Sequence, residues 1–145
     1  MKRAFICIFV LLLCLSCGKH APDPDPADYF VGNYTFKETC YVVWGGIPES
    51  FTDEGTFTLT KISSDKVKMT GAWKTTGTII GDTISFENCT LSDAKGYINY
   101  SFSTGTFAGN GLSFTYTGTG SSIKSNGRAY PWEQSGRVSA TKSSN

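Results

Sequence analysis

The sequence predicts an all-β fold, an antiparallel up-and-down meander of about eight strands that closes into a β-barrel. From residue 29 onward apolar and polar residues alternate with a period of two, which is typical of half-buried strands. Short segments rich in Gly, Asp, Asn and Ser separate the alternating runs and predict tight turns. Strands joined by tight turns become antiparallel neighbours, and about eight of them can close into a ring without free edges.

The individual strands follow from this alternation in chain order. The first two are expected at residues 33–42 and 56–60, where aromatic and aliphatic residues alternate with polar ones. Turns are expected at residues 63–65, 81–82 and 109–111. Further strands are expected at residues 66–71, 73–80, 82–90, 96–107, 112–119 and 128–141.

The N-terminus begins with Lys2 and Arg3, followed by an apolar run that is too short to span a bilayer of about 30 Å. Residues 1–16 are therefore expected to be a cleaved export signal. This start, with Cys17 behind the apolar run, resembles the signal of bacterial lipoproteins, which is cut before a cysteine that carries diacylglycerol. The resemblance implies that Cys17 is the lipid attachment site, and an ordinary secretory signal is the alternative.

Residues 17–28 are expected to be the lipidated cysteine and a tether, because three prolines alternate with acidic residues there and favour an extended chain. Residues 29–145 are expected to form one β-barrel domain. The lipoprotein resemblance implies a bacterial cell-envelope protein held by lipid, at the outer membrane, facing either the periplasm or the surface.

The composition excludes several classes of function. The 145 residues carry a formal net charge of +1 without a clustered basic stripe, so nucleic acid is not an expected partner. The only histidine, His20, lies in the tether, which removes histidine-based catalysis and the usual histidine-rich zinc site from the domain. The sequence therefore predicts a protein that is not an enzyme and that has no cofactor and no metal.

Two cysteines remain in the expected domain, because Cys7 and Cys14 leave with the signal and Cys17 carries lipid. In an oxidising envelope Cys40 and Cys89 could form a disulfide worth about 4 kcal/mol. Two free thiols are the alternative, since Cys40 follows the apolar phase of its strand and Cys89 the polar phase.

The segment Phe30-Val31-Gly32-Asn33-Tyr34 resembles the opening of the lipocalin and calycin families, in which Gly-x-Trp begins the first strand. Tyr34 stands in place of the Trp, so the chain is more similar to small lipocalin-like lipoproteins of gut Bacteroidota. The resemblance implies a short helical turn before the motif. It also implies that an arginine of the last strand, here Arg137, packs across the aromatic ring.

Five residues are candidates for a ligand site. Glu38 shares the inward phase of its strand. Either Arg137 or Arg128 could pair with it inside the barrel, or a bulge could turn it outward. Tyr34, Trp73 and Tyr100 could line a cavity, because pockets are mostly apolar with a few placed polar groups. The same aromatic side chains could instead fill the interior, since eight-stranded barrels are just wide enough for either arrangement.

Two functions are therefore considered. In the first, a lipid-anchored barrel binds a small, largely apolar ligand at one open end, which requires a cavity above about 300 Å³. In the second, a filled barrel contacts a protein as an interaction or inhibitor module, through loops at residues 44–53 and 121–132. Large apolar residues near these loops favour the second function. They are Trp44, Ile47, Phe51 and Trp132.

Overall fold

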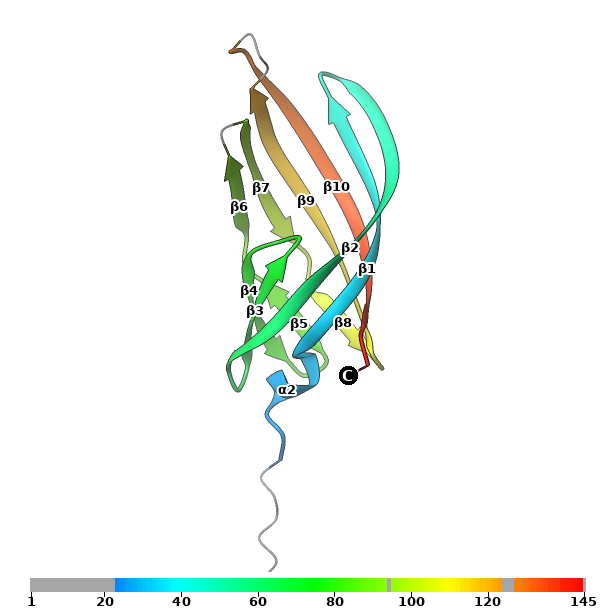
Figure 1. Cartoon of the computed structure of the whole chain (residues 1–145), viewed down its shortest axis with the longest axis vertical. Coiled ribbons are helices and arrows are strands. Elements are labelled where there is room, and N and C mark those ends of the chain that lie inside the picture. Colours follow the sequence, from blue (N-terminus) through cyan, green and yellow to red (C-terminus); the bar gives the residue numbers. More distant parts are fainter. Residues whose placement is uncertain (1–22, 94, 124–126, 145) are drawn as a thin grey trace, which may run out of the picture.

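Antiparallel strands make up almost all of the computed structural model, which describes residues 23–93, 95–123 and 127–144. Ten strands form one sheet, and one short helix precedes them (Figure 1). The elements are α2 (Pro26–Phe30), β1 (Gly32–Trp44), β2 (Ile47–Ser63), β3 (Lys66–Gly71), β4 (Thr75–Ile80), β5 (Thr83–Phe86), β6 (Cys89–Asp93), β7 (Gly96–Phe102), β8 (Gly105–Ala108), β9 (Gly111–Ile123) and β10 (Ala129–Lys142). The predicted all-β fold class is confirmed.

Eight of the strands close into a ring in the order β10-β1-β2-β3-β4-β5-β8-β9, and the pairing of β9 with β10 completes it. Each neighbouring pair is antiparallel. Strands β1 to β5 are neighbours in chain order, as expected of strands joined by short turns. The predicted lipocalin-like barrel is therefore present.

The remaining two strands, β6 and β7, form a hairpin beside the ring. The first residues of β9 pair with β8, and its later residues, from Tyr116 to Ser122, pair with β7. The strands expected at 82–90 and 96–107 are each two shorter strands, because the polar pairs Glu87-Asn88 and Ser103-Thr104 interrupt the extended chain. This gives ten strands where about eight were predicted.

The barrel has two halves of different construction. In the lower half in Figure 1, which we call the ring half, all eight ring strands enclose the interior. In the upper half, which we call the open half, residues 47–56 of β2 pair with β1 only. Among the described residues β6 pairs only with β7, so the six-stranded sheet β2-β1-β10-β9-β7-β6 has two free edges there.

The ring half is filled by a cluster of aromatic rings. Trp73, in the loop between β3 and β4, is 3% exposed and lies 5.1 Å from Phe36, 5.6 Å from Phe114 and 5.5 Å from Tyr116 between ring centroids. Such tilted and edge-to-face contacts add to the free energy of burial. The prediction that Trp73 begins a strand is wrong, because its loop folds the indole into the barrel.

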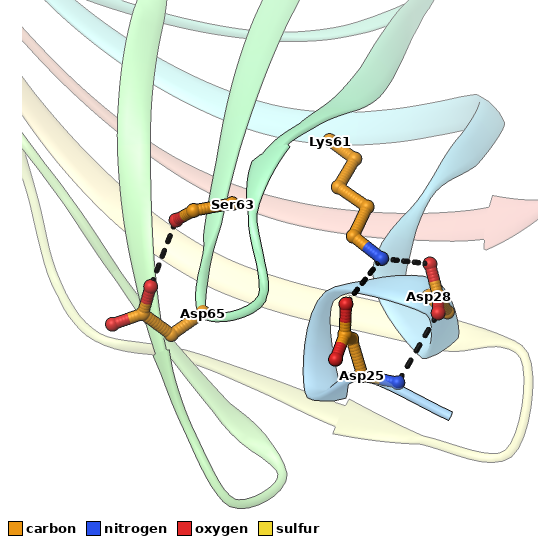
Figure 2. Close-up of polar contacts among 5 residues, drawn as sticks. All are labelled: Asp25, Asp28, Lys61, Ser63 and Asp65. Carbon is orange, nitrogen blue, oxygen red and sulfur yellow. Dashed lines mark hydrogen bonds and ion pairs between the residues drawn. The ribbon is translucent and has the colours of Figure 1, made fainter. Parts of the chain in front are cut away.

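Helix α2 is attached to the barrel at the base of the ring half. Lys61 Nζ lies 2.6 Å from Asp25 Oδ2 and 2.8 Å from Asp28 Oδ1 (Figure 2). The Ala27 N–H donates to the Ser64 carbonyl at 2.9 Å, and the Ala27 side chain is buried. The short helical turn implied by the lipocalin resemblance is therefore present.

Helix α2 and its cap Asp25 lie before residue 29, where the folded domain was expected to begin. Asp25 caps the helix and Pro26 occupies its first turn, where the missing N–H of proline has no helical partner to lose. The last residues of the expected tether are thus part of the domain. The predicted signal at 1–16, the lipidation site Cys17 and the tether up to residue 22 lie outside the described residues.

The turn between β1 and β2 is a hairpin of two residues, Gly45 and Gly46, with φ of 55° and 87°. Positive φ at both positions matches the twist of the flanking strands and favours glycine. The loop expected at 44–53 is therefore mostly strand. Within the part of the chain that the structure describes, no helix is long and apolar enough to span a bilayer.

Candidate functional site

The inward face of the open half presents a row of apolar side chains near its rim. Residues paired in register lie on the same face of a sheet, so one row can be followed across six strands. The register pairs Ile47 with Trp44, Trp44 with Trp132, Trp132 with Gly120, Gly120 with Ile98, and Ile98 with Leu91. Within this row Ile47 and Trp44 are exposed, Trp132 and Leu91 are half-buried, and Ile98 is buried.

A groove of about 310 Å³ lies along this row. The indole rings of Trp44 and Trp132 stack in it, 5.4 Å apart and 13° from parallel. Trp44 is 44% exposed. The groove is lined by Trp44, Leu91, Ser92, Asp93, Lys95, Gly96, Tyr97, Ile98, Ser121, Ser122 and Trp132.

Glycine at position 120 makes room for the Trp132 indole. A Cβ at Gly120 would lie 3.2 Å from Trp132 Cε2 and would clash with the Tyr97 carbonyl of β7. A Cβ at Gly118, one step further along the inward face, would meet the side chain of Ile98 at 2.8 Å. The small inward residues of β9 therefore let the groove walls approach the sheet.

A buried polar cluster lies below the groove, next to the filled ring half. The Tyr116 hydroxyl donates to Glu38 Oε2 at 3.0 Å, and Gln134 Nε2 donates to the same hydroxyl at 2.5 Å. Cys40 Sγ lies 3.6 Å from Tyr116 Oη. A Cβ at Gly136 would clash with the Tyr116 ring, so glycine there allows the phenol to lie flat over β10. Glu38 is 8% exposed.

Burial controls the protonation of this cluster. It raises the pKa of Glu38, the hydrogen bond from Tyr116 opposes that shift, and the charge of Asp53 adds to it. Burial also raises the pKa of Tyr100 to about 12 and that of Tyr116 above its usual range. Both phenols therefore keep their protons at neutral pH and act as hydrogen-bond donors.

Two of the predicted ligand residues belong to the filled core. Tyr34 is fully buried, its ring stacks on Phe57 at 5.0 Å, and its hydroxyl donates to the Phe30 carbonyl at 2.6 Å. Trp73 is buried among the core rings. Neither side chain reaches the groove, because the eight-strand ring leaves room only for the side chains themselves.

Of the other ligand candidates, Tyr100 lies on the inward face with its ring 5.4 Å from that of Tyr116, at the level of the polar cluster. Arg137 lies on the outward, exposed face of β10, beside Thr39 and Thr115 in register. The predictions that Arg137 packs across Tyr34 or pairs with Glu38 inside the barrel are therefore wrong. Glu38 has Tyr116 as its partner instead.

The two cysteines of the domain are both free thiols, Cys40 buried and Cys89 half-buried. The possible disulfide is therefore not formed in this structure. Burial raises the pKa of each thiol, which keeps both protonated.

The sequence predicted Trp44, Ile47, Phe51 and Trp132 as contact residues but placed them on loops. All four instead lie on strands with inward phase. The groove residues Leu91, Ile98 and Gly120 were missed. Their proximity to the tryptophans depends on the register of five strand pairs, for which the sequence gives no local signal.

One solved structure similar to this chain is the S-type phycobiliprotein lyase CPES from Guillardia theta. The similarity covers 82% of this chain and 91% of that chain, with 8% sequence identity and a TM-score of 0.29. No family model and no curated protein matches the sequence. A TM-score this low carries no argument about a ligand or an activity.

The name of that structure runs counter to one prediction. The sequence predicts that the protein is not an enzyme, whereas the similar solved structure is named a lyase. The prediction is therefore withdrawn, and the function proposed below rests on the groove alone.

Proposed function

We propose that the protein is a lipid-anchored envelope protein whose open half binds one small, largely apolar molecule. The observation that carries the proposal is the stack of exposed Trp44 on half-buried Trp132 in a groove of about 310 Å³. This volume reaches the lower bound for sites that hold a small organic ligand. Apolar residues on an exposed concave face lose contact with water when such a ligand enters.

The filled ring half confines the ligand to the open half. Core residues such as Phe57 and Leu59 are at most 1% exposed, so nothing can enter the barrel from below. The polar cluster of Glu38, Tyr116 and Gln134 would form the floor of the site and supply hydrogen bonds to a polar group of the ligand.

The position of the helix indicates how a lipid anchor would orient the barrel. Helix α2 lies at the base of the barrel, and the chain enters there, opposite the rim of the open half (Figure 1). A lipid on Cys17 would therefore hold the ring half towards the membrane and leave the groove facing away from it.

Native mass spectrometry of the whole mature chain, residues 17–145 without lipid, tests the binding function. After incubation with an apolar extract of bacterial envelope, we expect one saturable small-molecule adduct. The variant Trp132→Ala should lose it, and Ile80→Ala, which removes an exposed apolar side chain far from the groove, should retain it. Bare protein across extracts of differing polarity would contradict the proposal.

A second function, contact with a protein partner, is favoured by the tip of the β1–β2 hairpin. Ile47 is 65% exposed and Phe51 is 45% exposed, and exposed large apolar residues often mark interfaces. A partner captured by wild-type protein and lost with Ile47→Ser, while the small-molecule adduct persists, would support this second function.

A further inference from the structure

The groove of the open half includes a charged turn, the hairpin between β6 and β7. Two of the residues that line the groove, Asp93 and Lys95, carry charges of opposite sign, and the others in the described lining are uncharged. Asp93 continues the inward phase of Leu91 on β6, and Lys95 lies in the turn itself. The groove therefore has an aromatic part at the two indoles and a part that presents both charges.

Backbone hydrogen bonds hold the charged turn in place. The Lys95 N–H donates to Asp93 Oδ1 at 2.7 Å, and the Lys95 carbonyl accepts from the Ile123 N–H of β9 at 2.6 Å. Gly96, directly after the turn, has a φ of 150°, and a Cβ there would clash with the Ser121 carbonyl. Because this position requires glycine, it places no side chain between the charged turn and the floor of the groove.

The two charges of the turn do not neutralise one another. Among the described residues neither Asp93 nor Lys95 forms an ion pair, although the two are only two positions apart. The Lys95 amide occupies one oxygen of the Asp93 carboxylate, and no described residue accepts a hydrogen bond from the Lys95 ammonium. Both side chains are exposed, so each is open to a ligand group of the opposite charge.

The distance from the indoles to the charged turn fits a short molecule. A Cβ on Gly120 would lie 3.2 Å from Trp132 Cε2, so the indole of Trp132 lies over β9. The next strands across the sheet are β7 and β6, with Ile98 and Leu91 in the same row. At about 4.8 Å between neighbouring strands, β6 lies about 10 Å from β9. An aromatic amino acid is of comparable length from its ring to its charged groups.

We infer that the ligand of the open half is a zwitterion of the amino-acid type, with an ammonium and a carboxylate group beside a flat apolar body. The inference rests on the proposed binding function and adds the charges of the ligand. The ammonium group would bind Asp93 and the carboxylate would bind Lys95, through charge-assisted hydrogen bonds. The apolar body would lie over Ile98, against the Trp132 indole.

The same two charges have a plainer explanation. Strand β6 lies at the edge of the sheet, and charged side chains at sheet edges block pairing with other chains. In that case Asp93 and Lys95 would have no influence on ligand binding, so the two explanations predict different results.

Four probes that share a phenyl ring on a two-carbon chain separate these explanations. They are the zwitterion phenylalanine, the anion 3-phenylpropionate, the cation 2-phenylethylamine and neutral ethylbenzene. Each is titrated at low salt into the whole mature chain, with the indole N–H signals of the three tryptophans followed by NMR. We expect phenylalanine to shift the signals of Trp44 and Trp132, and to bind about threefold more tightly than either singly charged probe. The signal of buried Trp73 serves as the internal control.

Variants at the turn assign each charge of the ligand to its partner. Lys95→Gln should weaken the binding of phenylalanine and 3-phenylpropionate about threefold, and should not weaken that of 2-phenylethylamine. Asp93→Asn, which keeps an oxygen acceptor for the Lys95 N–H, should weaken phenylalanine and 2-phenylethylamine but not 3-phenylpropionate. Lys66→Gln and Asp82→Asn, at exposed positions of the ring half, are the matched controls and should change no affinity.

Two results would overturn the inference: affinities that the variants at Asp93 and Lys95 leave unchanged, or phenylalanine that binds no more tightly than the singly charged probes. The proposed function would still stand in either case if ethylbenzene shifted the signals of Trp44 and Trp132. Absence of these shifts with all four probes would overturn both.

Discussion

The ring half and the open half are built largely from the same strands, yet one is filled and the other holds a groove. Strands β1, β2, β9 and β10 run through both. On β2, Phe57 is 1% exposed in the ring half, whereas Phe51, on the same face of the strand, is 45% exposed in the open half. Identical residues on one strand thus differ only in what lies across from them.

Closure of the sheet therefore decides which side chains are buried here, more than the residue types of a strand do. In the ring half β3, β4, β5 and β8 complete the circle, and Trp73 enters from a loop to fill the interior. In the open half no strand joins β6 to β2 among the described residues, and the inward glycines 118 and 120 of β9 leave space above the sheet.

The largest expected effect is the difference in free energy of unfolding between alanine variants of Phe57 and Phe51. Phe57→Ala should lower the free energy of unfolding by about 3–5 kcal/mol, because it leaves a cavity among packed rings. Phe51→Ala should cost less than about 1 kcal/mol, since its ring already faces solvent. Urea unfolding monitored by circular dichroism measures both, and equal losses would contradict the division into two halves.

A smaller effect is expected at the boundary between the halves, where Glu38 is buried. Because its pKa is raised above the ordinary value of 4.5, the fold favours the protonated carboxyl. This contribution to stability is complete below about pH 4.5 and is lost as the pH rises through the raised pKa of the folded state.

The variant Glu38→Gln cannot lose that contribution. Its free energy of unfolding relative to wild type should therefore increase between about pH 4 and pH 8 in urea titrations. Glu133→Gln, at an exposed outward position on β10, provides the control and should show no such trend. A constant difference between Glu38→Gln and wild type would show that Glu38 is not held in its protonated form.

The smallest effect is expected at α2, on the base of the ring half. Lys61→Ala removes both ion pairs to the helix, so the Ala27 amide, bonded to the Ser64 carbonyl, should exchange its hydrogen faster. Lys37→Ala, which removes an outward ion pair that does not touch α2, should leave the exchange of Ala27 unchanged. High salt should reduce the difference between the variants, because all three carboxylates are solvent-exposed.

By itself the sequence determined the fold class and the inward phase of most strands. Period-two alternation is a local property, so Tyr34, Phe36, Phe57 and Leu59 could be assigned to the inward face without knowledge of their partners, and all four are buried. It also singled out Trp44, Phe51 and Trp132 as exposed aromatic candidates. It missed the strand character of residues 47–55, because both faces of that segment are exposed and the alternation of apolar and polar residues fades.

Only the tertiary structure decided which aromatic residues fill the barrel and which line the groove. Trp73 and Trp132 are equally apolar in the sequence, but one folds into a closed ring and the other lies over Gly120 on an open sheet. Arg137 was one possible partner for Glu38, but the pleat places the two side chains on opposite faces of the sheet. These outcomes depend on strand register and closure, which are set by contacts between residues far apart in the chain and therefore have no local signature.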